Sequence, residues 1–282
     1  MKNKITVLLT TCDRYNTTLP ICLSSILSQT RLPDKIIIVD DSRNNSFYKN
    51  DVIKQLLVLS KLKNIEINYF YGAKKGQVPA LQLGLNEIDD GWVFKTDDDN
   101  FLEPNVLERF ESEIKNDIGA ISCLILDESS ITRSDNDVWM SSKIEDVYSC
   151  FNVQMVGIQN DKPKFVEHIY SNYFFRRDLS DDYPSELHPS SLREDTIFTH
   201  SIFRKGFKLL IIPDVKIYHL GSDNNSGNRQ WSGEHELKNE KIFLKYLENC
   251  KIIPDKIQLY ENEKIVFTKK NGKDFLVYKH FF

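Results

Sequence analysis

The sequence has few of the features that mark several large classes of protein. Its 282 residues include five cysteines, an odd number, and no C-x-x-C pair, so neither a zinc knuckle nor a disulfide framework follows. No apolar run approaches the roughly 20 residues that a membrane-spanning helix needs. Lysine and arginine are scattered and the net charge is -4, which argues against the concentrated basic surface of a nucleic-acid-binding protein. We therefore expect a cytoplasmic protein with reduced cysteines, no nucleic-acid partner and at most a peripheral contact with the inner face of a membrane.

Internal repeats, low-complexity linkers and a signal-peptide cleavage site are also missing from the sequence. Residues 1–11 carry two lysines and a short apolar stretch that runs straight into T-T-C-D-R-Y. We expect a first β-strand there and no signal peptide. A chain of this length can bury a sizeable core as one large α/β domain, with or without an appendage.

The order of the predicted elements indicates an α/β fold. Strands are predicted at 5–9, 35–39, 65–71 and 92–96, with helices at 19–28, 46–60 and 78–86 between them. We expect Thr18 to cap the first of these helices. This alternation predicts right-handed crossovers and a largely parallel sheet. Further on, we predict helices at 104–114, 194–204 and 234–249, strands at 118–126, 165–175 and 209–218, and short tail strands at 256–260, 264–268 and 275–278 around a turn at Asn271-Gly272.

The tetrad T-D-D-D at 96–99 closely follows the apolar run Trp92-Val93-Phe94. Three adjacent carboxylates repel one another, so we expect them mainly where a cation neutralises them. At the end of a buried strand they would point into the crevice where open α/β sheets bind ligands. Carboxylate oxygens suit Mg²⁺ or Mn²⁺, which in turn bridge to phosphate oxygens. The alternative is a solvated acidic loop that caps the helix starting near Pro104.

Six further segments follow a distinctive order along the chain. They are V-L-L-T-T-C-D-R-Y from residue 7, L-P-I-C-L-S-S-I-L-S-Q-T from 19, I-I-I-V-D-D-S from 36, G-Q-V-P-A-L-Q-L-G-L from 76, L-R-E-D-T from 192 and I-Y-H from 217. With V-F-K-T-D-D-D-N from residue 93, this ordered set resembles the family 2 glycosyltransferases, which have the Rossmann-like GT-A fold. The resemblance covers roughly residues 5–222. It implies a mostly parallel central sheet flanked by helices, with a donor half at about 1–100 and an acceptor half at about 101–222, followed by a lid loop, a helix and a small β tail at 223–282.

The resemblance implies an inverting, metal-dependent transferase. Such an enzyme moves a sugar from a nucleoside diphosphate sugar, here expected to be UDP-linked, to a hydroxyl group of a glycan or glycolipid, as in bacterial surface polysaccharide assembly. The donor-binding residues that it implies are Thr11, Asp13, Asp40, Lys75, Asp97 and Asp98. The Asp40 carboxylate would accept the ring N–H of uracil; alternatively, Asp40 and Asp41 only begin a polar turn, and Lys75 lies in an ordinary solvated one. Cys12 stands where the family often has an aromatic residue, which leaves the nucleotide base open.

The metal site implied by the resemblance consists of Asp99, Asp97 and His219, with Asp99 as the direct ligand of Mn²⁺ or Mg²⁺. Asp97 and Asp98 are also expected at the ribose hydroxyls or at waters of the metal. A divalent ion there would offset the charge that develops on the departing diphosphate. A lone histidine is more often a satisfied structural residue, so a structural role of His219 stays open beside the ligand role.

The pair Glu194-Asp195 opens the helix predicted at 194–204. Acids in a first helical turn are stabilised by the helix dipole, which is the alternative explanation. By resemblance, Asp195 is the general base that deprotonates the acceptor hydroxyl, and Glu194 is the fallback. Two other groups of residues could hold the acceptor, although their aromatic members could equally be core. They are Asn172 and Tyr173 in Y-S-N-Y-F-F-R-R, and Trp231 in the Gly- and Asn-rich segment 221–233, which resembles a lid.

Two other classes of function remain open from the sequence. A sugar-nucleotide nucleotidyltransferase also uses acids and a metal at a Rossmann-like crevice, but it usually needs a glycine-rich loop after the first strand, and T-T-C-D-R-Y has no glycine. A non-catalytic relative would bind the nucleotide sugar without turnover. The retention of every candidate acid argues against that second alternative.

Overall fold

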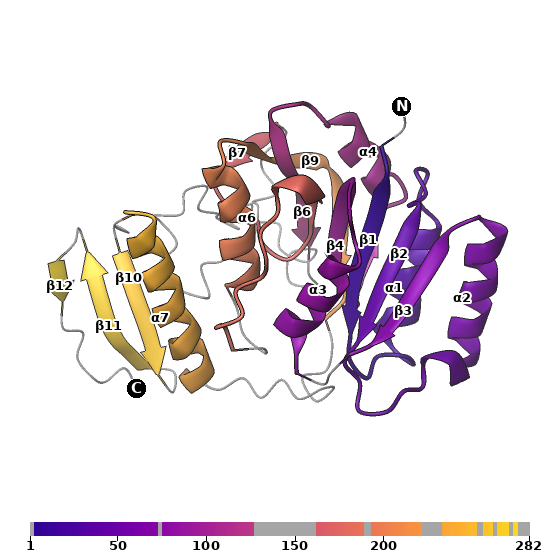
Figure 1. The fold of residues 1–282 in the computed structure, drawn as a ribbon, viewed down its shortest axis with the longest axis horizontal. Coiled ribbons are helices and arrows are strands. Elements are labelled where there is room, and N and C mark those ends of the chain that lie inside the picture. Colours follow the sequence, from indigo (N-terminus) through magenta and orange to yellow (C-terminus); the bar gives the residue numbers. More distant parts are fainter. Residues whose placement is uncertain are drawn as a thin grey trace.

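The computed structural model describes residues 3–72, 75–126, 162–188, 193–221, 233–252, 256–261, 264–270 and 273–275. Its four N-terminal strands are parallel and lie in the order β3-β2-β1-β4 (Figure 1). They are β1 (Ile5–Thr11), β2 (Lys35–Asp40), β3 (Glu66–Tyr71) and β4 (Trp92–Asp97). The helices that connect them are α1 (Thr18–Leu27), α2 (Asp51–Leu62) and α3 (Gln77–Asn86). The predicted alternation of strands and helices in this half is confirmed.

Two helix starts differ from the sequence-based prediction. The helix expected from residue 46 begins only at Asp51, because Asn50 caps it by accepting a hydrogen bond from the Ile53 amide; a 3-10 turn, Phe47–Lys49, precedes it. The predicted cap at Thr18 is wrong. Thr18 is already the first helical residue, and the residue before it makes no side-chain cap.

The second half of the chain extends the sheet with strands of both directions. These strands are β5 (Asn100–Leu102), β6 (Ile118–Leu126), β7 (Lys164–Val166), β8 (Tyr173–Arg176) and β9 (Lys208–His219). The sheet continues from β4 as β8-β6-β9-β5, and β7 pairs with β9. Strand β8 is antiparallel to both β4 and β6, whereas β6 and β9 are parallel, so the completed sheet is mixed.

The strand predicted at 165–175 is two strands in the structure. Ser171, between β7 and β8, has a φ of 65°, in the left-handed region that an extended strand cannot accommodate. The remaining helices are α4 (Val106–Ser112), α6 (Glu194–Arg204) and α7 (Gly233–Asn249). Strand β5 has three residues, and no sequence signal distinguished it from the acidic turn before it.

Helices cover both faces of the sheet because alternate side chains of its buried strands point to opposite sides. On one face, Leu8 of β1 and Ile37 of β2 pack in a cluster with residues of α3, α6 and α7. On the other, Val7 and Ile36 pack in a cluster with residues of α1, α2 and α4. Phe243 and Leu247 belong to the first cluster, so α7 shares this core. The division near residue 222 stays a prediction.

A separate antiparallel sheet follows α7. It consists of β10 (Lys256–Glu261), β11 (Lys264–Lys270) and β12 (Lys273–Phe275), and it lies beside α7 at the opposite end of the molecule from β3 (Figure 1). The turn predicted at 271–272 lies outside the described residues. Among the helices of the described part of the chain, none is both long and apolar enough to cross a membrane.

Acid should weaken the contact between α6 and α7 through His200. This side chain is 1% exposed, its Nδ1 lies 2.7 Å from the Tyr246 hydroxyl, and burial together with the Arg204 charge lowers its pKa to about 4. Because the unfolded chain protonates this histidine near its ordinary pKa of 6.5, stability should fall from that pH down to about 4, by up to about 3 kcal/mol. Urea unfolding of the wild type and of His200→Gln between pH 7.5 and 4.5 measures this. The variant should lose less stability, and parallel curves would contradict the prediction.

Candidate active site

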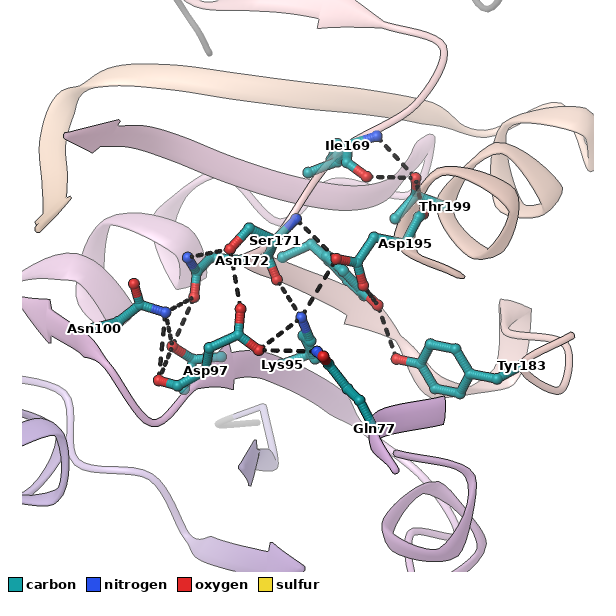
Figure 2. Close-up of polar contacts among 12 residues, drawn as sticks. Gln77, Lys95, Asp97, Asn100, Ile169, Ser171, Asn172, Tyr183, Asp195 and Thr199 are labelled. Carbon is teal, nitrogen blue, oxygen red and sulfur yellow. Dashed lines mark hydrogen bonds and ion pairs between the residues drawn. The ribbon is translucent and has the colours of Figure 1, made fainter. Parts of the chain in front are cut away.

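The carboxylates of the acidic tetrad diverge at the carboxyl end of β4. Asp97 ends the strand, and its Oδ1 lies 3.1 Å from Lys95 Nζ while its Oδ2 accepts a hydrogen bond from Ser171 Oγ at 3.2 Å (Figure 2). Asp98 and Asp99 lie in the turn before β5 and face the loop that follows β1. The tetrad therefore serves two different groups of partners, which its sequence alone did not reveal.

Asp98 and Asp99 share one arginine. Arg14 Nη1 lies 3.1 Å from Asp99 Oδ2 and 3.8 Å from Asp98 Oδ1, and all three side chains are about 10% exposed. The Thr11 hydroxyl donates to Asp98 Oδ2 at 2.6 Å. Burial raises the pKa of Asp98 to about 7; the Arg14 charge opposes the rise and the neighbouring Asp99 charge adds to it. The site thus concentrates more negative charge than Arg14 alone balances, which favours the binding of a further cation.

The predicted metal ligands come together only in part. His219 ends β9, and its Nε2 lies 3.5 Å from Asp99 Oδ2, because β5 places Asn100 opposite His219 in the sheet. Asp97 turns instead to Lys95. Within the described residues no group of three or more His, Cys, Asp or Glu side chains is arranged to hold a metal ion. Mg²⁺ is often held by only one or two carboxylates together with substrate phosphates, so an Asp99 site completed by a diphosphate fits the residues present.

The second group of partners surrounds a buried lysine. Lys95 Nζ donates to the backbone oxygen of Ser171 at 2.8 Å and to Asp195 Oδ2 at 3.4 Å, and it forms the ion pair with Asp97 (Figure 2). The Ser171 amide also donates to Asp195 Oδ2, at 3.0 Å. Burial lowers the pKa of Lys95, but the charges of Asp195 and Asp97 outweigh this effect and hold it above its ordinary value. Lys95 is therefore an ammonium ion that connects β4 to the start of α6.

Asp195 is oriented from three sides. Besides its two contacts on Oδ2, its Oδ1 accepts a hydrogen bond from Tyr173 at 2.8 Å. Burial raises the pKa of Asp195, the Lys95 charge opposes that rise, and the Asp97 charge adds to it. A carboxylate offers about four acceptor positions, so roughly one lone pair of Asp195 is left for an outside proton. Glu194, the predicted fallback, is also buried in the first turn of α6.

The predicted nucleotide residues lie around the ends of β1 and β2. Asp40 is 0% exposed, and its carboxylate accepts hydrogen bonds from the Tyr15 and Tyr69 hydroxyls and from the Ser42 amide. Its oxygens are thus engaged inside the protein, and its contact with a base stays a prediction. Asp13 has a φ of 57° and its amide donates to Ser42 Oγ.

The remaining predicted site residues are a lysine for the donor and three candidates for the acceptor, and they do not form one group in the described structure. Lys75 is exposed just before α3. Asn172 and Tyr173, the candidates for the acceptor, are both 0% exposed. Asn172 Oδ1 accepts from Thr96 Oγ1 at 2.6 Å, and the Tyr173 hydroxyl contacts Asp195, so these polar groups are engaged within the protein and their contact with an acceptor stays a prediction. Trp231 lies outside the described residues.

Three residues of this site were not among the candidates from the sequence. Arg14 stands inside the motif T-T-C-D-R-Y, and a single arginine there could have been paired with the acidic tetrad. Lys95 interrupts an apolar strand. A lysine in a strand that is buried on both faces needs anionic partners, so its position in the sequence could have predicted a nearby carboxylate. Ser171 contributes mainly backbone atoms and carries no signal in the sequence.

Comparisons with known proteins bear on the family and the fold of the chain. The sequence model described as glycosyl transferase family 2 matches residues 6–183, more than half of the chain. No curated protein matches the sequence significantly. Among solved structures, the chain is similar to S. aureus TarS 1-349 in complex with UDP-GlcNAc, with a TM-score of 0.59, 15% identity, and coverage of 87% of this chain and 67% of that one.

Two other solved structures are similar at the same level. One is GalNAc-T7 with UDP, GalNAc and Mn²⁺, with a TM-score of 0.60, 15% identity, and coverage of 87% of this chain and 48% of that one. The other is the mannosyltransferase PcManGT from Pyrobaculum calidifontis in complex with GDP-Man and Mn²⁺, with a TM-score of 0.56, 14% identity, and coverage of 89% and 65%. The chain thus spans about half to two thirds of the length of these structures. At identities this low the similarity shows the fold alone. The structural matches confirm the predicted α/β fold of the GT-A type.

Proposed function

The chain belongs to glycosyl transferase family 2, and we propose that this nucleotide-sugar-dependent transferase is a metal-dependent, inverting enzyme. We further propose that its donor is a UDP-sugar and that its acceptor is a hydroxyl group of a glycan or glycolipid. The family match favours sugar transfer over the nucleotidyl transfer that the sequence left open. The donor nucleotide is the least constrained part of the proposal, since the similar structures hold UDP-GlcNAc, UDP and GDP-Man, respectively.

One observation carries the proposal. Asp97 of the acidic tetrad and Asp195 at the start of α6 lie 98 positions apart in the chain, yet both contact the same ammonium group, at 3.1 and 3.4 Å. Parallel sheets bind ligands at the carboxyl ends of their strands, and Asp97 is at such an end. A donor bound along the tetrad would therefore have its reacting carbon near Asp195.

The proposed reaction is a single displacement. The acceptor oxygen attacks the anomeric carbon from the face opposite the diphosphate, and Asp195 takes the hydroxyl proton as the new C–O bond forms. The bond from the anomeric carbon to the diphosphate oxygen breaks, and its electron pair leaves with the diphosphate. One displacement inverts the configuration, and no carboxylate nucleophile is needed.

Asp99 and His219 are the residues proposed to hold a divalent cation, and Arg14 lies beside them. Such a cation supplies Lewis-acid stabilisation of the negative charge on the departing diphosphate. The nucleoside of the donor is proposed to contact Thr11 and Asp13, on the first strand and its loop, and Asp40. Its phosphates and ribose are proposed to contact Lys75 and Asp98.

We expect nucleotide sugars to stabilise the protein only in the presence of a divalent metal. Thermal unfolding with UDP-GlcNAc, GDP-mannose, a CDP-sugar and a dTDP-sugar, each with Mn²⁺ and with EDTA, tests this. A ligand at about 100 times its Kd adds about 2.7 kcal/mol of stability, which is a shift of several degrees for a chain of this size. One nucleotide class should raise the Tm with Mn²⁺ and not with EDTA.

Asp99→Ala should remove this metal-dependent shift because it removes the carboxylate nearest His219. Asp117→Ala is the matched control, since Asp117 is a half-exposed acid that pairs with Lys208 away from the tetrad. An equal shift in EDTA would show that the donor binds without the metal. The absence of a response to every nucleotide would favour the non-catalytic alternative.

A further inference from the structure

A fully buried lysine is the most unusual feature of the site. Lys95 is 0% exposed, and its side chain lies on the face of β4 that carries Val93, in register with Tyr173 of β8. Taking an ammonium ion out of water is costly unless it is paired and hydrogen-bonded. Val93, on the same face of β4, belongs to an apolar cluster with Tyr173 and Phe175, so Lys95 places a charge beside hydrophobic side chains.

The contacts of Lys95 match the capacity of its ammonium group. An ammonium ion has three N–H donors, and three oxygens surround Nζ: Ser171 O at 2.8 Å, Asp97 Oδ1 at 3.1 Å and Asp195 Oδ2 at 3.4 Å. Nζ also lies 5.6 Å from the centre of the Tyr173 ring. None of its donor positions is left for a substrate, so Lys95 can act on the reaction only through these neighbours.

Ser171 completes the connection between the two acids. Its amide donates to Asp195, its hydroxyl donates to Asp97, and its carbonyl oxygen accepts from Lys95. Ser171 has a positive φ, and in this conformation its amide points to Asp195 while its hydroxyl points to Asp97. Lys95 thus lies at the centre of a small framework in which two carboxylates approach the same cation.

We propose that Lys95 is a positioning residue, whose ammonium group holds the general base Asp195 at a set distance and orientation from the donor-side carboxylate Asp97. The proposal rests on the function proposed above. Two carboxylates that are close together in a low-dielectric site repel each other, and a shared cation both cancels the repulsion and draws them together. Without that cation, Asp195 would turn away from the position from which it takes the acceptor proton.

A positioning role for Lys95 predicts a loss of turnover in a folded variant, whereas an ordinary structural ion pair predicts only a loss of stability. In Lys95→Met the side chain keeps its length and loses its charge. We expect kcat to fall by at least about 10²-fold, because a positioned base typically contributes that much. The donor affinity should fall much less, by under about tenfold, since Asp98 and Asp99 of the tetrad keep their ion pairs with Arg14.

A double-mutant cycle with Asp195→Asn gives the decisive measurement, because a residue that acts through Asp195 has nothing to position once the base is gone. The assay measures the release of the nucleoside diphosphate in the presence of Mn²⁺. The donor is UDP-GlcNAc, or GDP-mannose if the thermal screen selects GDP-mannose. The kcat of Lys95→Met/Asp195→Asn should lie within about threefold of that of Asp195→Asn. The double variant removes the buried charges of both Lys95 and Asp195, so it should fold even if Lys95→Met alone does not.

Two results would overturn the proposal. One is a folded Lys95→Met protein with near-normal kcat, and the other is a double variant in which the two losses multiply. Failure of the proposed function gives a different pattern. In that case Asp195→Asn itself keeps its turnover, or the wild type releases no nucleoside diphosphate although it binds the donor.

Discussion

Asp195→Asn is expected to lower turnover by at least about 10²-fold and to leave donor binding close to that of the wild type. The reason is geometric. The carboxylate is held by Tyr173, Ser171 and Lys95, and about one of its acceptor positions is left to take a proton from an incoming hydroxyl. An amide at this position cannot take that proton.

The asparagine variant should still fold, which makes the experiment informative. Its Oδ1 can accept from the Ser171 amide and from Lys95, while its Nδ2 can donate to the Tyr173 hydroxyl oxygen. That hydroxyl lies 2.8 Å from the Tyr183 hydroxyl and can donate there. The variant therefore loses a charge and a proton acceptor, while each side-chain hydrogen bond of Asp195 keeps a counterpart.

The measurement compares kcat with the Kd of the donor, because removal of a general base lowers kcat and spares ground-state binding. Glu194→Gln is the matched control, since Glu194 is the adjacent acid in the same helical turn and is also buried. A loss in Glu194→Gln with normal turnover in Asp195→Asn would transfer the base role to Glu194. Near-normal turnover in both variants would remove this acidic pair from the chemistry.

Glu240→Gln is expected to destabilise the protein by about 3–5 kcal/mol, the usual cost of breaking a buried ion pair. Glu240 on α7 binds Arg193 in a bidentate pair, with Nε to Oε1 at 2.8 Å and Nη2 to Oε2 at 3.1 Å, and the two side chains are 5% and 0% exposed. The Arg193 guanidinium also stacks on the Phe243 ring, 4.5 Å from its centre. The glutamine variant removes the carboxylate that pairs with this buried arginine in the described part of the chain.

Arg193 is also the residue from which α6 starts, and its φ of 91° is a strained conformation for a side chain of this size. The pair with Glu240 holds that turn in place directly before Glu194 and Asp195. Loosening it should therefore lower turnover as well as stability.

Urea unfolding measures the change in stability, with Asp178→Asn as the control. Asp178 also forms a bidentate pair with an arginine, Arg176, but its side chain is 62% exposed. An exposed pair typically contributes about 0–1 kcal/mol, so the control should change little. Equal effects of the two substitutions would mean that burial of the Arg193–Glu240 pair contributes nothing beyond an ordinary surface pair.

The sequence by itself determined the α/β alternation of the first half and the position of the acidic tetrad at a strand end. Those features follow from local sequence patterns, since the runs at 36–39 and 92–94 are apolar and each is followed by acidic residues. The ordered motifs also predicted the family that the comparisons then showed. Short β5, the break at Ser171 and the start of α2 were missed or misplaced because they depend on single turns and caps.

Only the tertiary structure decided which charges meet. Asp97 and Asp98 are adjacent in the sequence, yet one contacts Lys95 and Ser171 while the other contacts Thr11 and Arg14. Their partners lie more than 70 residues away in most cases, brought near by the pairing of β4 with β1 and β8. Periodicity along a chain specifies which side of a strand a residue occupies. It cannot specify which distant side chain is packed against that side, because that depends on the assembly of the whole sheet.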